Sequence, residues 1–486
     1  MMMLAAALVT VRLFWLHPPV SVRVNGKEYH TAAKFTGDLK LEVAGTPALT
    51  IHGPLDIAPH NGHLQLTLHM PREEYVAGVL GGESSVFKSE EALAAMAVAA
   101  RTYAVKHAGR HAAEGFDFCD TTHCQDLRLA AISNRMRAAA ENTESELLWY
   151  EGRPADTYYH RNCGGTTEAA DQVWSGVRVP YLKQQIDTFC TRAQWQSNIS
   201  KQELGGAVEI LSHTPSGRVA EVRVGTRRIS SMVFQENVGR TLGWEKLRSN
   251  MYSIVDRSNE ILFQGYGAGH GVGLCQDGAD ARGVHGQTYQ QILAFYYPGT
   301  SLGVSAQGFA WSRMNGERVE VFSTHAAEDS DVVAKADRAL QLAETRSGIP
   351  VAGRPRVRVY PSVAAFRDAT GEEGYVAAST RGSVIRMQPP ALLRSARTLD
   401  STLLHEMLHV AVESQAHPRT PLWFREGLVL YLAAGPRQRP SEAQTRVQKM
   451  VDKYGRATVM DWLRTGTGEP EKQAPARIPT PAHTPR

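Results

Sequence analysis

Short runs of alternating apolar and polar residues open the chain and then give way to a longer period. Over residues 9–70 the alternation occurs in stretches such as Val20–Val24, with Gly, Pro and Asn between them, which predicts β-strands. From 71 to about 105 the apolar residues recur at helical spacing. This spacing is interrupted at Gly81-Gly82 and resumes in the Ala-rich stretch Glu90–Val105. We therefore predict two helices separated by the glycine pair.

A second pattern begins near Val332. It predicts a helix to about Arg346, strands at Arg356–Tyr360 and Ser383–Met387, and then two further helices. The end of the chain is rich in Pro and Thr and lacks apolar periodicity, which predicts disorder. We expect an α+β protein with a leader remnant (1–8), a strand-rich first domain containing the Ala-rich helix (9–303), a linker (304–330), a smaller α+β domain (331–464) and a disordered tail (465–486).

Composition and charge exclude two broad classes of protein. Hydrophobic residues make up 42% and charged residues 21% of the 486 positions, and the mean hydropathy is -0.30, as in globular proteins. No run approaches the roughly 18–20 consecutive apolar residues of a membrane span, so no integral span is expected. The net charge of +4, without basic runs, argues against a nucleic-acid partner. The apolar start Met3–Val11 lacks a preceding basic residue and a clear cleavage site, so the compartment stays open.

The cysteines do not form a disulfide scaffold, and one group of them could hold a metal ion. Five cysteines are too few for such a scaffold in a long chain, and an odd number leaves at least one unpaired or bound to another group. Cys119, His123 and Cys124 lie within six residues, and His111 lies upstream as a fourth ligand. Two thiols and two imidazoles suit a structural Zn²⁺ ion, although this spacing is tighter than in ordinary zinc knuckles. Cys275 is expected to be a small buried thiol.

Two features of the first domain carry candidate chemistry. Glu83 follows the glycine pair, where a side chain can point into a cleft. Glu73 and Glu74 lie in the first turn of the same predicted helix, where acids complement the helix dipole, so they need no further role. The segment Gly265–Gly273 has a glycine at every second position and contains His270. It forms either a groove in which His270 and backbone amides contact a polar ligand such as a sugar, or a tight β-connection. We reject a dinucleotide site because Leu274–Gly278 does not indicate a helix start.

Seven ordered motifs occur in residues 9–303. They are Pro71–Glu83, Glu91–Tyr103, Phe118–Gln125, Tyr159–Thr167, Pro180–Leu182, Gly267–Ala279 and Tyr296–Thr300. In order and spacing they resemble the stage II sporulation protein D family, also called the amidase enhancer domain. The resemblance implies a bacterial protein that acts on peptidoglycan outside the cytoplasm. Its action would be that of a lytic transglycosylase on denuded glycan strands, or of an activator of cell-wall amidases.

The resemblance assigns the essential acid to Glu83. A single carboxylic acid suffices for a lytic transglycosylase, because it can protonate the glycosidic oxygen and then take the proton from the muramic acid C6 hydroxyl as the 1,6-anhydro ring closes. Arg101, His270 and Gln276 are the residues we expect to bind substrate. Arg101 could grip a lactyl or peptide carboxylate, or it could form a salt bridge on the helix surface.

This sequence departs from the family pattern at two positions. Met96 stands where relatives mostly carry Gln, and Ser84 where Met is usual. Neither change removes the acid, but both concern the detailed contacts with the sugar. Cys163 and Cys190 recur together in the family pattern, which implies a disulfide between them in an exported protein.

The second domain contains the pattern His-Glu-x-x-His at 405–409. On a helix the two histidines lie one turn apart on one face and can reach one metal ion. Thr420-Pro421 is a good start for a second helix, Leu422–Ala434, which carries Glu426 in the motif Trp-x-x-Glu-Gly.

These two helices resemble the gluzincin metallopeptidases, and more narrowly their peptidase MA-like branch, over about 331–435. The resemblance implies that His405, His409 and Glu426 bind Zn²⁺ and that Glu406 is the general base. Tyr431 could support the oxyanion or belong to the core.

Three hypotheses follow. The chain is a bifunctional cell-wall enzyme that cleaves glycan and carries a zinc hydrolase, which we favour; a metallopeptidase held to peptidoglycan by its first domain; or a non-enzymatic activator of a separate amidase. All three place the protein outside the cytoplasm, in the periplasm or cell envelope.

Overall fold

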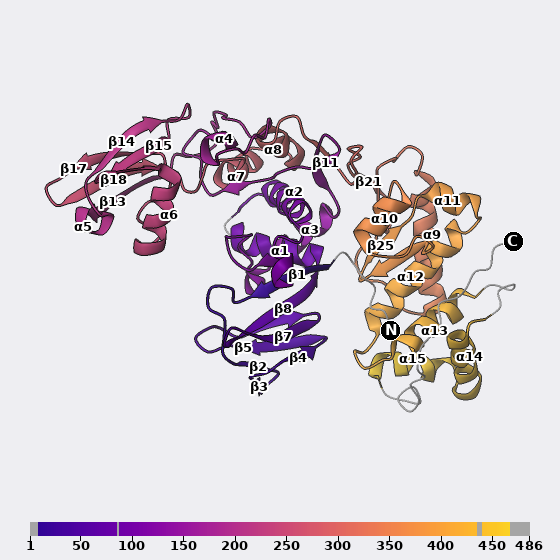
Figure 1. The fold of residues 1–486 in the computed structure, drawn as a ribbon. Helices are drawn as coiled ribbons and strands as arrows, with labels where there is room; N and C mark the ends of the chain where they lie inside the picture. Colours follow the sequence, from indigo (N-terminus) through magenta and orange to yellow (C-terminus); the bar gives the residue numbers. More distant parts are fainter. Residues whose placement is uncertain (1–7, 85–86, 435–439, 467–486) are drawn as a thin grey trace. The chain divides into compact units, whose positions relative to one another are not determined.

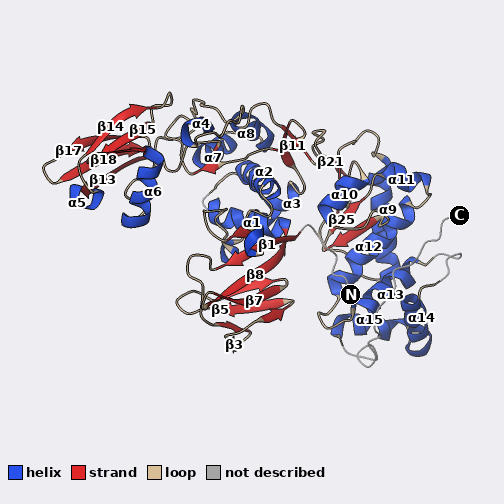
Figure 2. Cartoon of the chain, viewed as in Figure 1, coloured by secondary structure: helices blue, strands red, loops and turns tan. Residues whose placement is uncertain are grey.

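The computed structural model describes residues 8–84, 87–434 and 440–466, which form two compact units. The first unit comprises Leu8–Gly308, and the second begins at Phe309. Each contains both helices and sheets (Figures 1 and 2), which confirms the predicted α+β class. The expected leader remnant and tail lie almost wholly outside the described residues. Among the described residues, no helix combines the length and apolar character that crossing a membrane requires.

The N-terminal strands build two sheets around one core. Alternate residues such as Val11 and Leu66 are fully buried, as the period-two pattern predicted. The five-stranded sheet has the order β4 (Ala33–Phe35), β7 (Leu55–His60), β8 (His63–Pro71), β1 (Leu8–Leu13), β9 (Phe118–Cys119). The four-stranded sheet has the order β3 (Lys27–Tyr29), β2 (Val22–Val24), β5 (Asp38–Glu42), β6 (Leu49–His52).

Two helices follow β8 directly. Helix α1 is Arg72–Glu83 and helix α2 is Glu90–Lys106, so α1 runs through the glycine pair that we expected to end it. The glycines serve packing instead. A Cβ atom on Gly81 would lie 2.7 Å from the carbonyl oxygen of Arg128, and one on Gly82 would overlap that of Asp126. The segment after β9 can therefore lie directly against the helix.

Residues 194–266 of the first unit form a smaller group of elements with its own core (Figure 1). One sheet has the order β13 (Gln194–Ser200), β18 (Glu260–Tyr266), β17 (Tyr252–Asp256), and another has the order β14 (Val208–His213), β15 (Val219–Val224), β16 (Arg227–Ser230). Helices α5 (Lys201–Leu204) and α6 (Ser231–Leu242) accompany them.

Short elements complete the first unit around α2. They are β10 (Leu147–Tyr150), β11 (Arg153–Pro154), β12 (Tyr159–His160), β19 (Leu274–Cys275), β20 (Ser301–Gly303), α3 (Asn134–Asn142), α4 (Ala170–Val173), α7 (Gln276–Val284), α8 (Tyr289–Tyr296) and the 3-10 turns Ala112–Glu114 and Leu129–Ala131.

The glycine-rich segment is a tight connection that leads into a helix. Helix α7 begins at Gln276, so the absence of a helix start that we expected there was wrong. Four alternate glycines have φ between 71° and 92°, and the amides of two of them, Gly267 and Gly269, donate to carbonyl oxygens of this chain. A Cβ atom on Gly273 would overlap the carbonyl oxygen of Tyr158. The second of our two interpretations, the β-connection, fits these contacts.

The second unit packs helices against one five-stranded sheet. Its order is β21 (Ser312–Asn315), β22 (Glu320–Ser323), β23 (Arg356–Val359), β25 (Val384–Met387), β24 (Ala378–Arg381), with β22, β23 and β25 parallel. Strands β21 and β22 lie within 304–330, so much of the stretch expected to be a linker belongs to this unit. The helices are α9 (Asp331–Ser347), α10 (Val363–Thr370), α11 (Pro390–Ser395), α12 (Leu399–Gln415), α13 (Leu422–Ala433), α14 (Glu442–Tyr454) and α15 (Arg456–Thr465).

Replacing Gly273 with Ala should destabilise the first unit. The φ of +71° disfavours any residue with a Cβ atom by about 1 kcal/mol, and overlap with the Tyr158 carbonyl adds about 1–3 kcal/mol. Gly286→Ala is a matched control, because Gly286 has a φ of +85° but no atom within 4 Å of the added Cβ. We expect Gly273→Ala to lower the thermal midpoint clearly more than Gly286→Ala. Equal shifts would contradict the packing argument.

Candidate functional site

Glu83 is the last residue of α1, and its carboxylate is held by two donors from distant segments. The backbone N–H of Asp126 donates to Oε1 at 3.1 Å, and the side-chain amide of Gln276 donates to Oε2 at 3.0 Å. Gln276 is the first residue of α7 and is 3% exposed. The structure therefore brings two of the predicted site residues, Glu83 and Gln276, into direct contact.

The surroundings of Glu83 favour its protonated form. Burial raises the pKa of the carboxyl group from its ordinary value, and the negative charge of Asp126 adds to this increase. The two hydrogen bonds and the guanidinium of Arg128 act in the opposite direction, but burial outweighs them. The side chain keeps partial access to solvent. A carboxylic acid in these surroundings can deliver a proton to a bound substrate.

His270 lies beside aromatic rings. Its Nδ1 accepts a hydrogen bond from the backbone N–H of Val272 at 3.1 Å, and its ring centre lies 5.0 Å from that of Trp174 and 5.6 Å from that of His160. Burial lowers the pKa of His270 to about 4, and the positive charge of Arg218 contributes. His270 is therefore neutral near neutral pH and could offer a sugar only neutral contacts.

Arg101 lies in the core and is fully buried. Its guanidinium forms a bidentate ion pair with Glu73 and donates to the carbonyl oxygens of Ala140 and Glu146 and to the hydroxyl of Thr143. These contacts differ from both interpretations of the sequence, the substrate carboxylate clamp and the surface salt bridge. The reason is that α3 and the segment before β10 cover this side of α2.

The residues that depart from the family pattern are also buried. Met96 is 0% exposed in the core of α2, and Ser84 is 1% exposed at the end of α1. Neither side chain is placed to contact a sugar, so our interpretation that both changes concern sugar contacts needs correction.

Sequence reasoning missed a buried chain of hydrogen bonds next to Glu83, in which Tyr75 donates to Gln125 and Gln125 donates to Tyr159. Gln125 is the last residue of the motif Phe118–Gln125, and its place in that motif was the feature of the sequence that could have indicated it.

The structure brings the side chains of the predicted cysteine–histidine cluster close together. The Sγ atom of Cys124 lies 3.4 Å from Nε2 of His111 and 3.8 Å from Nδ1 of His123, and Cys119 Sγ lies 3.7 Å from the same Nδ1 atom. Ligand atoms around a tetrahedral Zn²⁺ with bonds of about 2.0–2.3 Å lie about 3.4–3.8 Å apart, so these four residues fit the ion. Glu114 contacts Nδ1 of His111 at 2.6 Å, which fixes the ring orientation.

The second unit brings His405, His409 and Glu426 together from α12 and α13. The two Nε2 atoms lie 3.2 Å apart, and Glu426 oxygens lie 3.3 Å from His409 Nε2 and 4.0 Å from His405 Nε2. The separations resemble those around a tetrahedral zinc ion, so the residues fit a three-ligand site. Burial lowers the pKa of His405. At His409 burial is also the largest single effect and disfavours the charge, but the hydrogen bond with Glu426 and the negative charges of the neighbouring glutamates together outweigh it and raise the pKa.

Glu406 lies on the same helix and is held by the edge strand β24. The hydroxyl of Thr380 donates to Oε2 of Glu406 at 2.7 Å, and Glu406 is 6% exposed. Tyr431 packs against the core of the unit. The sequence Thr420-Pro421 suggested Thr420 as the N-cap of α13, but its hydroxyl donates to the carbonyl oxygen of Leu463 and the N-cap is Pro421.

Replacing Glu73 with Leu should test the core position of Arg101. Removing one partner of a buried ion pair leaves an unpaired charge and costs about 3–5 kcal/mol. The double variant Glu73→Leu/Arg101→Met removes both charges, so we expect it to recover much of that loss. Chemical unfolding of the two variants and of Arg101→Met measures the coupling. If the changes in the free energy of unfolding of the two single variants add up to that of the double variant, Arg101 and Glu73 do not stabilise each other. That result would favour an external ligand for Arg101.

Known proteins resemble the first unit. A family model described as stage II sporulation protein matches residues 60–150, and a model described as a domain of unknown function matches 196–273. The chain is 32% identical over 268 residues to an uncharacterized protein of Brachyspira hyodysenteriae, covering 52% of this chain and 72% of that protein.

Two relatives from Bacillus subtilis carry functional names. The amidase enhancer is 28% identical over 286 residues, which cover 46% of this chain and 40% of the enhancer. Stage II sporulation protein D is 26% identical over 280 residues, which cover 51% of this chain and 79% of that protein. The chain therefore spans less than half the length of the enhancer.

Proposed function

The chain belongs to the stage II sporulation protein D family through its first unit, and from this premise we propose that the unit cleaves peptidoglycan glycan strands as a lytic transglycosylase. The observation that carries the proposal is the half-buried Glu83 carboxyl group, whose pKa is raised by burial and which two donors hold in place. The substrate lies outside the cytoplasm, so the proposal includes export to the periplasm or cell envelope.

Glu83 serves as acid and then as base. In its neutral form it donates its proton to the glycosidic oxygen as the bond to C1 of muramic acid breaks. The resulting carboxylate takes the proton of the C6 hydroxyl, whose oxygen forms the new bond to C1, so water is not consumed. The N–H groups of Asp126 and Gln276 stabilise the carboxylate between these steps. They also hold both oxygens in one orientation, so one carboxyl group can perform both transfers.

A second candidate function for this unit is non-enzymatic. The amidase enhancer of Bacillus subtilis is similar over 286 residues, so the unit could bind glycan and activate a separate cell-wall amidase. In that case Glu83 would contact the sugar without transferring a proton. A buried acid with a raised pKa gives no advantage to simple binding, and we therefore favour catalysis.

Digestion of denuded glycan strands by the full chain tests the proposal. We expect anhydro-muramyl products from the wild type and at least a hundredfold loss in Glu83→Gln, because the proton donor contributes about 10²–10⁴ to such rates. The rate should fall as pH rises through the pKa of Glu83, which lies above its ordinary value, because only the neutral acid can donate.

Glu74→Gln is the matched control for this experiment, since Glu74 lies on the same helix and is ion-paired with Arg137. It should retain wild-type products. Equal cleavage by the wild type and Glu83→Gln would remove Glu83 from the mechanism. No cleavage by any form, with glycan binding retained, would establish the activator function instead.

We propose that the second unit is a zinc-dependent peptidase with His405, His409 and Glu426 as ligands. Zinc bound there would act as a Lewis acid that polarises a scissile carbonyl. Glu406 accepts the proton of the attacking water and passes it to the leaving amine, and Thr380 orients its carboxylate. Strand β24 pairs with β25 alone among the described strands, so its other edge could bind an extended peptide. The His111, Cys119, His123 and Cys124 cluster would hold a second, structural zinc ion.

Metal content and peptide hydrolysis together test the second unit. His405→Ala should lose one zinc equivalent per chain and all hydrolysis of cell-wall peptides. Glu406→Gln keeps the three ligands, so it should retain that zinc while hydrolysis falls at least a hundredfold. Thr380→Val should reduce kcat more than it changes KM. Retention of all zinc by His405→Ala would overturn the ligand assignment, and full hydrolysis by Glu406→Gln would overturn the role of the base.

A further inference from the structure

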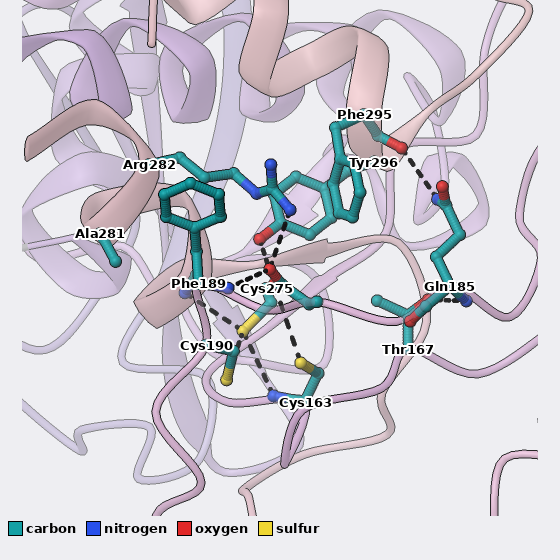
Figure 3. A network of polar contacts seen from close by, with 12 residues as sticks. Cys163, Thr167, Gln185, Phe189, Cys190, Cys275, Ala281, Arg282, Phe295 and Tyr296 are labelled. Atoms are coloured by element: carbon teal, nitrogen blue, oxygen red, sulfur yellow. Dashed lines mark hydrogen bonds and ion pairs between the residues drawn. The ribbon is translucent and has the colours of Figure 1, made fainter. Parts of the chain in front are cut away.

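A second group of sulfur atoms lies in the first unit, apart from the cluster around Cys119. Cys163, Cys190 and Cys275 are buried free thiols, and Figure 3 shows their side chains gathered together. They come from three segments far apart in sequence: the loop after β12, the loop that precedes β13, and the end of β19. His160, at the end of β12, lies beside them.

The candidate ligand atoms of this group lie close to one another, and Cys190 joins it through Cys275. The sulfur atoms of Cys190 and Cys275 lie 3.5 Å apart. Ligand atoms of His160, Cys163 and Cys275 all lie within 4.8 Å of one another. Sulfur atoms around a tetrahedral Zn²⁺ with Zn–S bonds of about 2.3 Å lie about 3.8 Å apart. Small movements of the side chains would therefore place one ion among all four residues.

One ring nitrogen of His160 has no hydrogen-bond partner among the described residues, which suggests that it binds a ligand. The side chain is 4% exposed, and its Nδ1 lies 3.1 Å from the carbonyl oxygen of Val272. A carbonyl oxygen only accepts, so Nδ1 carries the proton and Nε2 presents a lone pair. Nε2 is buried and has no hydrogen-bond partner among the described residues. A histidine with one nitrogen bound to a backbone carbonyl and the other free to coordinate is the usual arrangement at a metal site.

The polar groups nearby also suit thiolate ligands. The sulfur of Cys275 accepts from the backbone N–H of Cys163 at 3.2 Å and from that of Gly278, in the first turn of α7, at 3.3 Å. Such donors stabilise negative charge on sulfur. The buried Arg218 donates to the carbonyl oxygen of Cys163 at 2.7 Å and brings a positive charge to a cluster whose ligands and ion would sum to −1.

One acidic group faces the same cluster. Asp187 lies 3.9 Å from the sulfur of Cys163, which would oppose a thiolate there. The carboxylate of Asp187 is already paired, since Arg282 donates to it at 3.0 Å and the hydroxyl of Tyr296 donates to it at 2.6 Å.

We propose that His160, Cys163, Cys190 and Cys275 form a buried structural zinc site. Three thiolates and one imidazole are a common ligand set for structural zinc, and the closed, buried position leaves no place for a reacting water. The competing arrangement is a disulfide between two of the three cysteines, such as the Cys163–Cys190 pair that the sequence implied. That arrangement leaves the third thiol and Nε2 of His160 without a partner.

The site would support the catalytic acid, an extension that rests on the proposed function of Glu83. Cys275 caps the first turn of α7, and the next residue, Gln276, donates to Glu83. An ion bound to Cys275 would fix the start of α7 and therefore the position of the Gln276 amide. Gln276 is then a positioning residue whose own position depends on the metal.

Zinc content of the full chain tests the site. We expect Cys190→Ala and His160→Ala each to lose one zinc equivalent relative to the wild type. Cys119→Ala should lose a different equivalent, so Cys119→Ala/Cys190→Ala should lose two. His270→Ala is the control, because His270 lies next to His160 but is not a ligand. Substitution with Co²⁺ should give a sulfur-to-metal charge-transfer band that Cys190→Ala weakens and His405→Ala does not.

Thiol counting keeps the test decisive if a variant fails to fold. Wild-type protein, denatured with a chelator but without a reductant, should expose five free thiols. Three thiols, with a disulfide mapped among Cys163, Cys190 and Cys275, would overturn the proposal. Unchanged zinc content in both Cys190→Ala and His160→Ala would overturn it too. These readouts do not involve glycan cleavage, and Glu83→Gln should keep all its zinc, so failure of the two proposals can be told apart.

Discussion

In the first unit, burial and hydrogen bonding act together on one carboxyl group, that of Glu83, and determine its protonation and its orientation. Burial alone would keep Glu83 neutral and leave its orientation free, whereas hydrogen bonds alone would stabilise the carboxylate and lower the pKa. The structure combines the two through donors that lie 43 and 193 residues further along the chain. The elements that carry these donors must therefore be fixed against α1. The glycines of α1 achieve this for the segment at Asp126, because only a helix surface without side chains admits the backbone so closely.

The other buried charges of the unit fix the helices around that site. The ion pair of Arg101 and Glu73 joins α2 to α1, and the same guanidinium binds carbonyl oxygens of the chain that follows. An arginine with all its donors engaged in the core contributes orientation rather than substrate affinity. Asp187 and Arg282 do the same around α7. Two buried ion pairs thus brace the two helices, α1 and α7, that carry Glu83 and Gln276.

Local patterns in the sequence predicted the elements well where one helix or strand carries the whole signal. The Ala-rich α2, the strands of the N-terminal sheets, and α9, α12 and α13 all follow from periodicity. Three of the errors share a cause: they concern positions whose structure is determined by segments distant in the sequence. Gly81-Gly82 indicated a break because nothing in the sequence shows that the segment at Asp126 packs on them. Arg101 resembled a binding residue because its cover comes from α3, and strand β21 was too short to recognise without the sheet it joins.

The same distinction separates the three groups of candidate metal ligands. His405 and His409 are one helical turn apart, and Cys119, His123 and Cys124 are adjacent in sequence, so ligand spacing alone indicated both sites. His160 and Cys163 are three residues apart, but Cys190 and Cys275 lie 27 and 112 residues beyond Cys163, so no local spacing connects all four. Their convergence follows from the parallel pairing of β12 with β19, which places His160 directly opposite Cys275. Since β19 leads into the helix that begins with Gln276, the side chains joined by this pairing lie next to the residue that donates to Glu83. Clusters of this kind are found only once the strand register is known.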